Sequence, residues 1–566
     1  MTVQGMPAVN DTSIQNNSLI ANSAVLDEAH IGHIHGAFGT ILHGDDGPRI
    51  SFRARWKTLL AVLGPGLIVM VGDNDAGAFG TYTQAGQNYG TTLLWTLPLL
   101  IPVLYVNQEM VLRLGAVSGI GHARLILERF GKFWGAFSVI DLFLLNALTI
   151  VTEFIGISLA LDYLGLPRNL GVLASALIVM LAVSTGNFRR FERFAVCLVF
   201  GSLLLVPIIL MVHPPIGQVA RDLLIPKMPH DGKLSEVMLL IIAIVGTTVA
   251  PWQLFFQQSY VVDKRITPRF IRYERLDLWI GIVFVMIGAV AMVAFCAAAF
   301  AGRPEDGNFV DAGAVAAGLE KYAGKAPAIF FALALIDACI IGAAAVSLST
   351  AYAIGDVLSL RHSLHRKPNQ AKAFYGVYFG LILLAAVLVL TPGTPLGLLT
   401  NAVQTLAGVL LPSATVFLLL LCNDRAVLGP WINSRWLNLF TGVVIAVLVM
   451  LSLILTSSVL FPDITESQIL WILIAGSIVS VVTAIGGSFT KYAQVPGQAA
   501  EAVASLGSNG SDQENRYLWR MPPLENLPPA QLTALSRVWL FVLRAYLVVA
   551  AGLVLARIVM LATGHA

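Results

Sequence analysis

Residues 64–80 read GPGLIVMVGDNDAGAFG and place two acids, Asp73 and Asp75, within a run of apolar residues and glycines. The apolar character extends over residues 58–86, which is longer than the roughly 20 residues that a helix needs to cross a bilayer. An acid is costly in lipid, so two acids at this depth indicate a functional site. The glycines predict a broken helix whose freed carbonyl groups face a cavity. The alternative is that the span is misplaced and the acids lie at the membrane surface.

The composition of the whole chain is that of a membrane protein. Its 566 residues are 57% hydrophobic and only 12% charged, with a mean hydropathy of +0.78, whereas about a quarter of the residues in a soluble domain are charged. The net charge of +3 gives no reason to expect a nucleic-acid partner. The four cysteines form no CxxC pair, so neither a disulfide framework nor a thiolate metal site is expected. The polar N-terminal stretch is not expected to be a secretory signal.

Apolar stretches long enough to span a membrane recur along the chain and predict an all-α polytopic protein with about 12–13 spans. They lie at about 58–86, 92–114, 134–163, 170–186, 194–213, 236–261, 278–301, 326–358, 374–391, 397–421, 437–461 and 468–488. One more apolar segment, 538–562, contains Arg544 and Arg557. It is either a further span or an interfacial helix, and we favour a span.

Basic residues cluster in alternate connections between these spans, which sets the predicted orientation. The rich connections are cytoplasmic by the positive-inside rule, so the N-terminus is expected in the cytoplasm, with the bundle in a bacterial inner membrane. The sixth span is then inverted relative to the first, as in the inverted repeats of secondary transporters. The predicted parts are a polar cytoplasmic tail (1–57), a first five-helix repeat (58–213), a second, inverted repeat (236–421), accessory helices (437–488) and a polar cytoplasmic linker (489–535).

The sixth span contains a second predicted interruption. Residues 246–253 read GTTVAPWQ, and Pro251 has no N–H to donate to the carbonyl group one turn earlier, at Thr247. A single proline in a membrane helix often makes only a kink. Two interrupted helices in corresponding positions of two repeats, however, are the best sequence indication of a transport site.

These stretches resemble the motifs of the natural resistance-associated macrophage protein (NRAMP) divalent-metal transporters. Residues 75–79, DAGAF, are similar to the family's first-helix motif Asp-Pro-Gly-Asn-Phe, and residues 248–254, TVAPWQL, to its sixth-helix motif Thr-Val-Met-Pro-His-Asn-Leu. Gln404 resembles the family's tenth-helix glutamine, and Glu153 the third-helix glutamate. The resemblance covers about residues 58–490. It implies a LeuT-like inverted five-plus-five helix repeat with extra C-terminal helices and a metal site between the broken first and sixth helices.

The resemblance also suggests which positions form the metal site. Asp75 matches the family's ligand aspartate, whereas Ala78 and Ala250 stand where the family has a ligand asparagine and a ligand methionine. We expect Asp75 to be the one indispensable ligand, completed by carbonyl charge near Thr247 and by the amide oxygen of Gln404 or Gln253. The family's sixth-helix histidine is replaced by Trp252, and its third-helix aspartate, linked to proton movement, by Ile150.

With these substitutions, the sequence resembles a divergent branch of the family that is described as magnesium transporters. Loss of a thioether and an amide leaves a roomy site of oxygen ligands, which suits hard, hydrated ions. We therefore expect Mg²⁺ and/or Mn²⁺ as the transported substrate, no cofactor, and weak or absent proton coupling. The alternatives are an ordinary proton-coupled Mn²⁺/Fe²⁺ importer and a LeuT-like carrier of an organic solute. The chain contains neither HExxH nor GxSxG, so an enzyme is not expected.

Several other polar residues have two interpretations each. Asp73 either holds outer-shell water or caps the break, and Asp337 either lines the ion path or forms a hydrogen bond between helices. Trp252 and Glu153 are further candidates for the path or the surroundings of the metal. The N-terminal tail either chelates a metal or is solvated and disordered, and its candidate ligands are His30, His33, His35, His43, Asp45 and Asp46. The lipid bilayer is the expected surrounding; the oligomeric state is not predicted, and a monomer fits the sequence.

Overall fold

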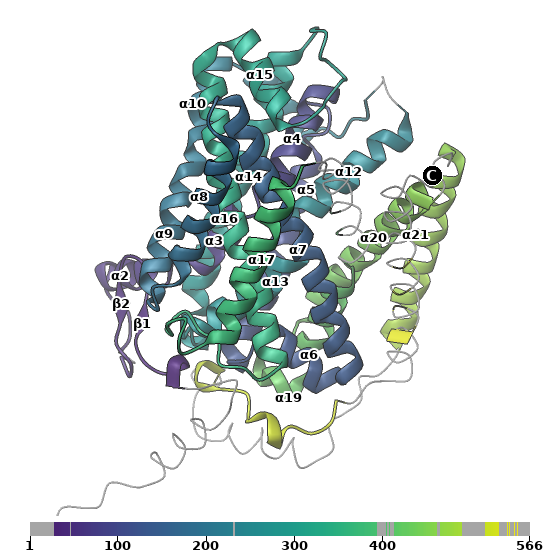
Figure 1. Cartoon of the computed structure of the whole chain (residues 1–566). Helices are drawn as coiled ribbons and strands as arrows, with labels where there is room; N and C mark the ends of the chain where they lie inside the picture. Colours follow the sequence, from purple (N-terminus) through teal and green to yellow (C-terminus); the bar gives the residue numbers. More distant parts are fainter. Residues whose placement is uncertain are drawn as a thin grey trace, which may run out of the picture.

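The computed structural model describes residues 28–45, 47–229, 233–392, 412–460, 465–489 and 516–530, together with positions 403, 407, 540, 541, 543, 548 and 552. Long helices run side by side in one bundle, and a small hairpin lies at one end of it (Figure 1). The predicted segment 538–562 and residues 490–515 of the predicted linker lie outside the described residues, apart from those isolated positions.

The first half of the chain contains the N-terminal hairpin and the helices of the first predicted repeat. Its elements are η1 (Glu28–His30), β1 (Ile34–His35), β2 (Thr40–Ile41), α2 (Phe52–Val62), α3 (Pro65–Val71), α4 (Ala76–Tyr89), α5 (Thr96–Ser118), α6 (His122–Phe130), α7 (Lys132–Tyr163), α8 (Arg168–Val183), α9 (Phe188–Gly201), η2 (Ser202–Leu204) and α10 (Leu205–Val212).

The second half contains the helices of the second predicted repeat and the accessory helices. Its elements are α11 (Ile216–Leu224), α12 (Leu234–Thr248), α13 (Pro251–Asp263), η3 (Pro268–Phe270), α14 (Ile271–Phe300), α15 (Ala312–Ala323), α16 (Lys325–Val357), α17 (Lys372–Leu390), a short helix Pro412–Cys422, α19 (Arg425–Leu428), η4 (Gly429–Trp431), α20 (Arg435–Leu460), α21 (Glu466–Phe489) and η5 (Leu524–Asn526).

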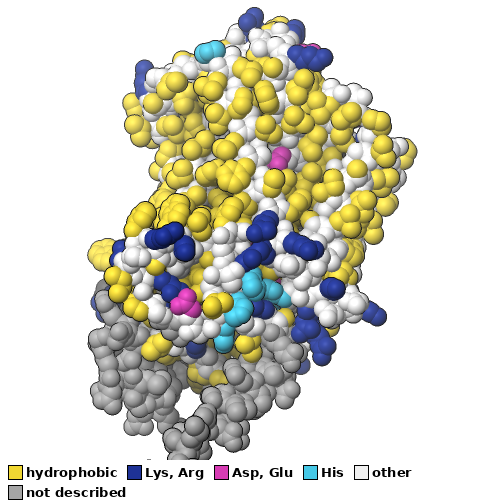
Figure 2. Space-filling model, turned by 90° about the vertical axis from the view of Figure 1, so that its left-hand side faces the viewer, with side chains coloured by type: hydrophobic (Ala, Val, Ile, Leu, Met, Phe, Trp, Pro, Cys, Tyr) yellow, Lys and Arg dark blue, Asp and Glu magenta, His cyan; other side chains and the backbone are white. Residues whose placement is uncertain are grey.

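The membrane character predicted from the sequence agrees with the helices. Within the described ranges, eight helices are long and apolar enough to cross a membrane, α2 and α3 form one further bent pair, and three shorter apolar helices lie at Arg168–Val183, Pro412–Cys422 and Glu466–Ile478. Each of the twelve spans predicted between residues 58 and 488 overlaps one of these, whereas 538–562 lies outside the described residues apart from isolated positions. Figure 2 shows a broad band of hydrophobic side chains on one face of the bundle, with Lys, Arg and His gathered below it. We call the end of the bundle that carries the hairpin, where Arg189, Arg193 and Arg265 donate to the hairpin backbone, the basic end.

The first predicted span contains a bend that the sequence does not predict. The chain bends by 50° between α2 and α3, so the helix that leads to the break starts at Pro65 rather than at residue 58. Gly64 makes the bend with a φ of 153°, a conformation that favours glycine. The side chain of Asp277 accepts hydrogen bonds from the N–H groups of Gly64 (3.1 Å) and Gly66 (2.7 Å), which satisfies donors that a helix start leaves free.

Helix α14 packs closely along α3 and α4, and α16 along α7. The α3–α14 contact is a backbone contact, since a Cβ atom at Gly66 would lie 2.7 Å from the backbone of Leu278, and one at Gly281 would lie 2.7 Å from the carbonyl oxygen of Gly66. Helices α20 and α21 pair with each other at the side of the bundle, where α20 also touches α5 and α12 (Figure 1).

Two parts expected to be solvated instead pack on the bundle. Residues 28–45 of the predicted polar tail form the hairpin, in which Ile34 pairs with Ile41 and His35 with Thr40. Part of the predicted linker also docks, because Arg129 donates to the carbonyl group of Pro528 (2.6 Å) and Trp431 to that of Arg516 (2.9 Å). The expectation of a disordered tail is therefore wrong for residues 28–45, where arginine side chains bind the backbone carbonyl groups.

Candidate functional site

The first helix break holds the carboxylate predicted to bind metal. Helix α3 ends at Val71 and α4 begins at Ala76, and Asp75 is the N-cap of α4. Its Oδ1 accepts a hydrogen bond from the backbone N–H of Ala78 at 2.9 Å, and the residue is only 7% exposed. A carboxylate is stabilised at this position because the first N–H groups of a helix have no partner within the helix. The break thus fixes a buried negative group at the start of α4.

The second break is made by backbone alone. Helix α12 ends at Thr248 and α13 begins at Pro251; between them Val249 is non-helical and Ala250 is extended. No side chain caps α13, and Pro251 occupies its first turn. Because proline has no N–H, the carbonyl group of Thr247 receives no hydrogen bond from position 251. This is the break that the sequence predicts.

The two breaks face each other. A Cβ atom at Gly77 would lie 3.2 Å from Oδ1 of Asp75 and 3.5 Å from Oγ1 of Thr247, so the carboxylate and the hydroxyl group flank the same glycine. The hydroxyl groups of Tyr82 in α4 and Thr248 in α12 share a hydrogen bond of 2.6 Å, which joins the two broken helices. The structure therefore brings the predicted Asp75 and Thr247 together. Tyr82 was not foreseen, since no local pattern marks its distant partner.

Glu153 lies beside this site. It is fully buried in α7, its Oε2 accepts a hydrogen bond from the N–H of Ala76 at 3.2 Å, and its carboxyl group faces that of Asp75. A Cβ atom at Gly342 of α16 would lie 2.9 Å from Oε1 of Glu153, so the glycine leaves the space that the side chain fills. Glu153 thus links α7 to the first turn of α4, next to the predicted ligand.

Asp73 and Gln253 are bound to each other. Gln253 donates a short hydrogen bond through Nε2 to Oδ1 of Asp73, and its Oε1 accepts one from Nε2 of Gln108 at 3.1 Å. All three side chains are buried. Both ends of the Gln253 amide are therefore engaged in this conformation, and its oxygen is held by Gln108 rather than directed to a ligand. Asp73 connects α3 to α13 here, a role that neither interpretation from the sequence included.

The remaining predicted site positions are apolar or lie elsewhere. Ala78 and Ala250 supply no side-chain ligand atom, and the buried indole of Trp252 packs against the first break, 3.5 Å from where a Cβ atom at Gly72 would lie. Gln404 lies outside the described residues. Among the described residues, no group of three or more His, Cys, Asp or Glu side chains has the geometry to hold a metal ion, in the hairpin or elsewhere.

Asp337 occupies a separate cavity between α3, α4, α10 and α16, with an empty volume of about 250 Å³. Its other polar lining residues are Asn74 and Ser202, and the rest of the lining is apolar. One carboxylate, one amide and one hydroxyl group offer too few oxygens to replace the hydration shell of a metal ion. Asp75 is not among the residues that line this cavity.

The sequence comparisons identify the family to which this arrangement belongs. The model of the Nramp family, described as natural resistance-associated macrophage protein-like, matches residues 66–458. The chain belongs to this family. It is 30% identical over 405 residues to the divalent metal cation transporter MntH of Ralstonia nicotianae, covering 67% of this chain and 87% of that protein. It is 27% identical over 424 residues to MntH of Latilactobacillus sakei, covering 71% and 90%.

A solved structure supports the fold. The manganese transporter of Eremococcus coleocola, in complex with an aromatic bis-isothiourea compound, superposes with a TM-score of 0.62 at 23% identity, covering 78% of this chain and 97% of that one. The predicted LeuT-like fold of this Nramp-family chain is thus confirmed, and the protein is a membrane transporter rather than an enzyme. The assignment to a magnesium-transporting branch stays a prediction.

Proposed function

We propose that this Nramp-family transporter carries Mg²⁺ and/or Mn²⁺ across the bacterial inner membrane by alternating access, with weak or no proton coupling. The observation that carries the proposal is the buried carboxylate of Asp75, which faces Thr247 across two helix breaks. A hard oxygen anion suits any divalent cation, and the relatives are named divalent metal cation transporters.

The small side chains around the breaks favour hard ions. Ala78 and Ala250 leave Asp75 as the only charged group that the sequence predicts as a direct ligand. A site with one carboxylate, backbone carbonyl groups and free space suits an ion that keeps several of its waters, as Mg²⁺ does. A thioether ligand, which would favour softer metals, is missing at position 250.

Weak coupling is supported by the groups that replace the family's titratable residues. Trp252 and Ile150 cannot take up a proton, and Glu153 is already engaged by the backbone N–H of Ala76. A negative-inside membrane potential favours entry of a doubly charged ion by about 4.6 kcal/mol per 100 mV, so no proton is needed to drive it. The concentration of basic side chains at the hairpin end supports a cytoplasmic N-terminus (Figure 2).

The test is uptake into proteoliposomes with Mg²⁺, Mn²⁺, Ca²⁺ and Zn²⁺ side by side and a pH-sensitive dye in the lumen. We expect Mg²⁺ or Mn²⁺ to enter without matching acidification of the lumen. The control is Asp141→Asn, which changes another acid of α7, twelve residues before Glu153, and should retain uptake. Zn²⁺ transport without Mg²⁺ or Mn²⁺ transport would contradict the proposed substrate. Acidification that follows metal entry would favour the ordinary proton-coupled importer, and competition by amino acids an organic-solute carrier.

A further inference from the structure

The N-terminal hairpin is attached to the basic end of the bundle by specific contacts. We call residues 28–45 the arm: η1 followed by the β1–β2 hairpin, which lies against α2 (Figure 1). The match to the Nramp family model begins at residue 66, so the arm lies outside the part of the chain that resembles the family. It is therefore a feature that the family resemblance does not explain.

Helix α9 binds the tip of the hairpin. Arg189 donates to the carbonyl groups of Gly36 and Gly39, both at 3.0 Å, and Arg193 to that of Ala37 at 3.0 Å. Glu192, between them, accepts a hydrogen bond from the N–H of Ala37. Side chains three and four residues apart lie on one face of a helix. One face of α9 thus binds the backbone of the tip: its two arginines donate to carbonyl groups, and its glutamate accepts from an N–H group.

A buried ion pair lies directly beneath the tip. The second carboxylate oxygen of Glu192 pairs with Lys264, which follows α13, and both side chains are 0% exposed. Lys264 also donates to the carbonyl groups of Val62 (2.6 Å) and Leu63 (2.9 Å), at the bend between α2 and α3. A buried pair is strongly destabilised when one partner is lost. The arm therefore completes a network that ties α2, α9 and the end of α13 together.

The arm also contacts the first helix through its backbone. A Cβ atom at Gly36 would lie only 2.0 Å from the carbonyl oxygen of Ala61, so any larger side chain at position 36 must push the hairpin off α2. At the other end of the arm, Arg265 donates to the carbonyl groups of Ala29 (2.6 and 3.0 Å) and His33 (2.9 Å). The arm is thus held at the tip of the hairpin and near its own N-terminal end.

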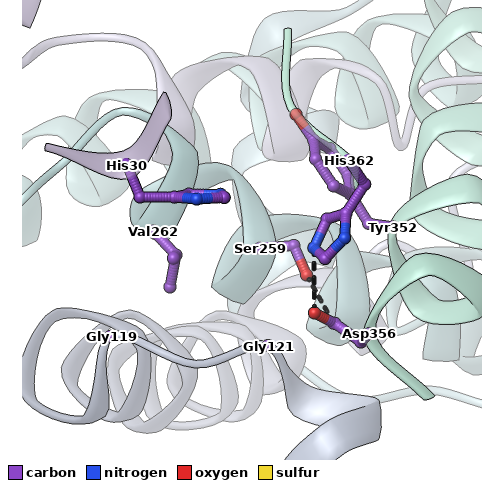
Figure 3. A pocket seen from close by; sticks show the side chains of 8 residues that line it. All are labelled: His30, Gly119, Gly121, Ser259, Val262, Tyr352, Asp356 and His362. Atoms are coloured by element: carbon purple, nitrogen blue, oxygen red, sulfur yellow. Dashed lines mark hydrogen bonds and ion pairs between the residues drawn. The ribbon is translucent and has the colours of Figure 1, made fainter. Parts of the chain in front are cut away.

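His30 anchors the arm in a cavity at the basic end. It lines a pocket together with His362, Tyr352 and Asp356, and Figure 3 shows its imidazole ring opposite these side chains. The ring centroids of His30 and His362 are 6.0 Å apart. The other walls come from the α5–α6 connection and from α13. Through His30 the arm also contacts the C-terminal end of α16 and the connection that follows it.

We propose that the arm is a strap that keeps the basic end of the transporter closed, and that its release accompanies opening of the metal site towards that end. Two half-helices, α3 and α13, run from the helix breaks to the basic end, and the arm network holds the bend that precedes α3 and the end of α13 to α9. A path from Asp75 to this side requires α3 or α13 to move away from α9 or α16, which breaks these contacts. The inference rests on the proposed function only in that such an opening is a step of transport.

The test measures access to the site without measuring transport. Cys339 is a native reporter, because it is fully buried and a Cβ atom at Gly156 would lie 2.6 Å from its Sγ and 3.1 Å from the Cβ of Ala76, beside the first break. A membrane-impermeant thiol reagent is applied to vesicles of full-length protein from the basic-end side. Labelling is followed at each cysteine by mass spectrometry, and Cys296, buried in α14 against Gly86, is the internal reference.

Two independent variants release the strap. Arg189→Ala with Arg193→Ala removes four hydrogen bonds to the hairpin, three of them to carbonyl groups of the tip and one to the hydroxyl group of Thr40, and Gly36→Val lifts the tip from Ala61. The matched controls are Arg190→Ala, an exposed neighbour, and Gly47→Ala, where a Cβ atom meets nothing closer than 3.7 Å. We expect Cys339 to be labelled on the order of tenfold faster in both strap variants, since a few lost hydrogen bonds shift a two-state equilibrium by about that much, and at the wild-type rate in both controls.

Unchanged labelling of Cys339 in both strap variants would overturn the proposal. Equal acceleration at Cys296 would also overturn it, because the bundle would then have loosened as a whole. Metal uptake measured in parallel separates the two proposals. Faster labelling in a protein that transports no divalent metal would leave the strap standing and refute the proposed function, whereas normal uptake with unchanged labelling would refute the strap alone.

Discussion

The two breaks each interrupt a membrane helix, but different chemical groups lie at each break. Between α3 and α4, a carboxylate caps the second half-helix, since Asp75 accepts the N–H of Ala78. Between α12 and α13, no side chain caps the helix and a proline starts it. The first break therefore supplies charge, whereas at the second the carbonyl group of Thr247 receives no hydrogen bond from position 251. The site depends on both, but only the first can neutralise a cation.

The largest effect is expected when the negative charge of Asp75 is removed while its capping of α4 is kept. Asp75→Asn retains an amide oxygen that can cap α4, because asparagine and aspartate are equally good N-caps. We expect divalent-metal uptake to fall on the order of a hundredfold, as when one partner of a buried charge pair is removed, while the thermal unfolding temperature in detergent stays that of the wild type. Uptake near normal in this variant would refute Asp75 as the charged ligand.

The second break is tested by giving it a ligand. Ala250→Met places a thioether where the chain has none, and soft ligands favour transition metals over Mg²⁺. We expect the ratio of Mn²⁺ to Mg²⁺ uptake to rise about tenfold, by analogy with the ordering of metal affinities for softer ligands. Ala243→Met, a substitution at a half-buried position one turn or more before the break, is the control and should leave the ratio unchanged. An equal rise in both variants would show that position 250 does not face the ion.

Glu153 distinguishes a positioning role from a proton-carrying one. Glu153→Gln can still accept the hydrogen bond from Ala76 but cannot exchange a proton in the same way. We expect uptake within about twofold of wild type and an unchanged pH profile, whereas Glu153→Ala leaves the Ala76 N–H unpaired and destabilises the fold by about 1–3 kcal/mol. A pH profile that shifts in Glu153→Gln would instead show that this acid titrates during transport.

The smallest expected effect lies far from both breaks, at the basic end. His362 pairs with Asp356 at 3.1 Å, and this carboxylate, with Asp263 nearby, raises the pKa of His362 above its ordinary 6.5 despite burial. Because the folded-state pKa is the higher one, the stabilisation is fully present below pH 6.5 and is lost as the pH rises through the raised pKa. Thermal unfolding from pH 6 to pH 9 should therefore show a decline in stability that is smaller in His362→Gln. An equal decline in both proteins would mean that the pair contributes nothing.

The sequence located the breaks because their causes are local. Glycines, acids and Pro251 act on the backbone within one turn of where they stand, so residues 72–75 and 249–250 are marked by composition alone. The bend within the first predicted span was missed for the opposite reason. The bend at Gly64 is held by Asp277 and Lys264, which lie about two hundred residues along the chain and are joined to it only in the folded protein.

What the sequence by itself determined is the membrane class, the family, the two breaks and the charge at Asp75, since each depends on nearby residues or on a motif. Only the tertiary structure decided which partners these groups have. Gln253 appeared to be a free amide but is held by Asp73 and Gln108, and the polar tail appeared solvated but is bound by Arg189 and Arg193. A hydrogen bond between distant segments produces no pattern in the sequence of either segment. Each polar side chain alone could bind solvent, an ion or another side chain, and only the packing of the folded protein decides which partner it has.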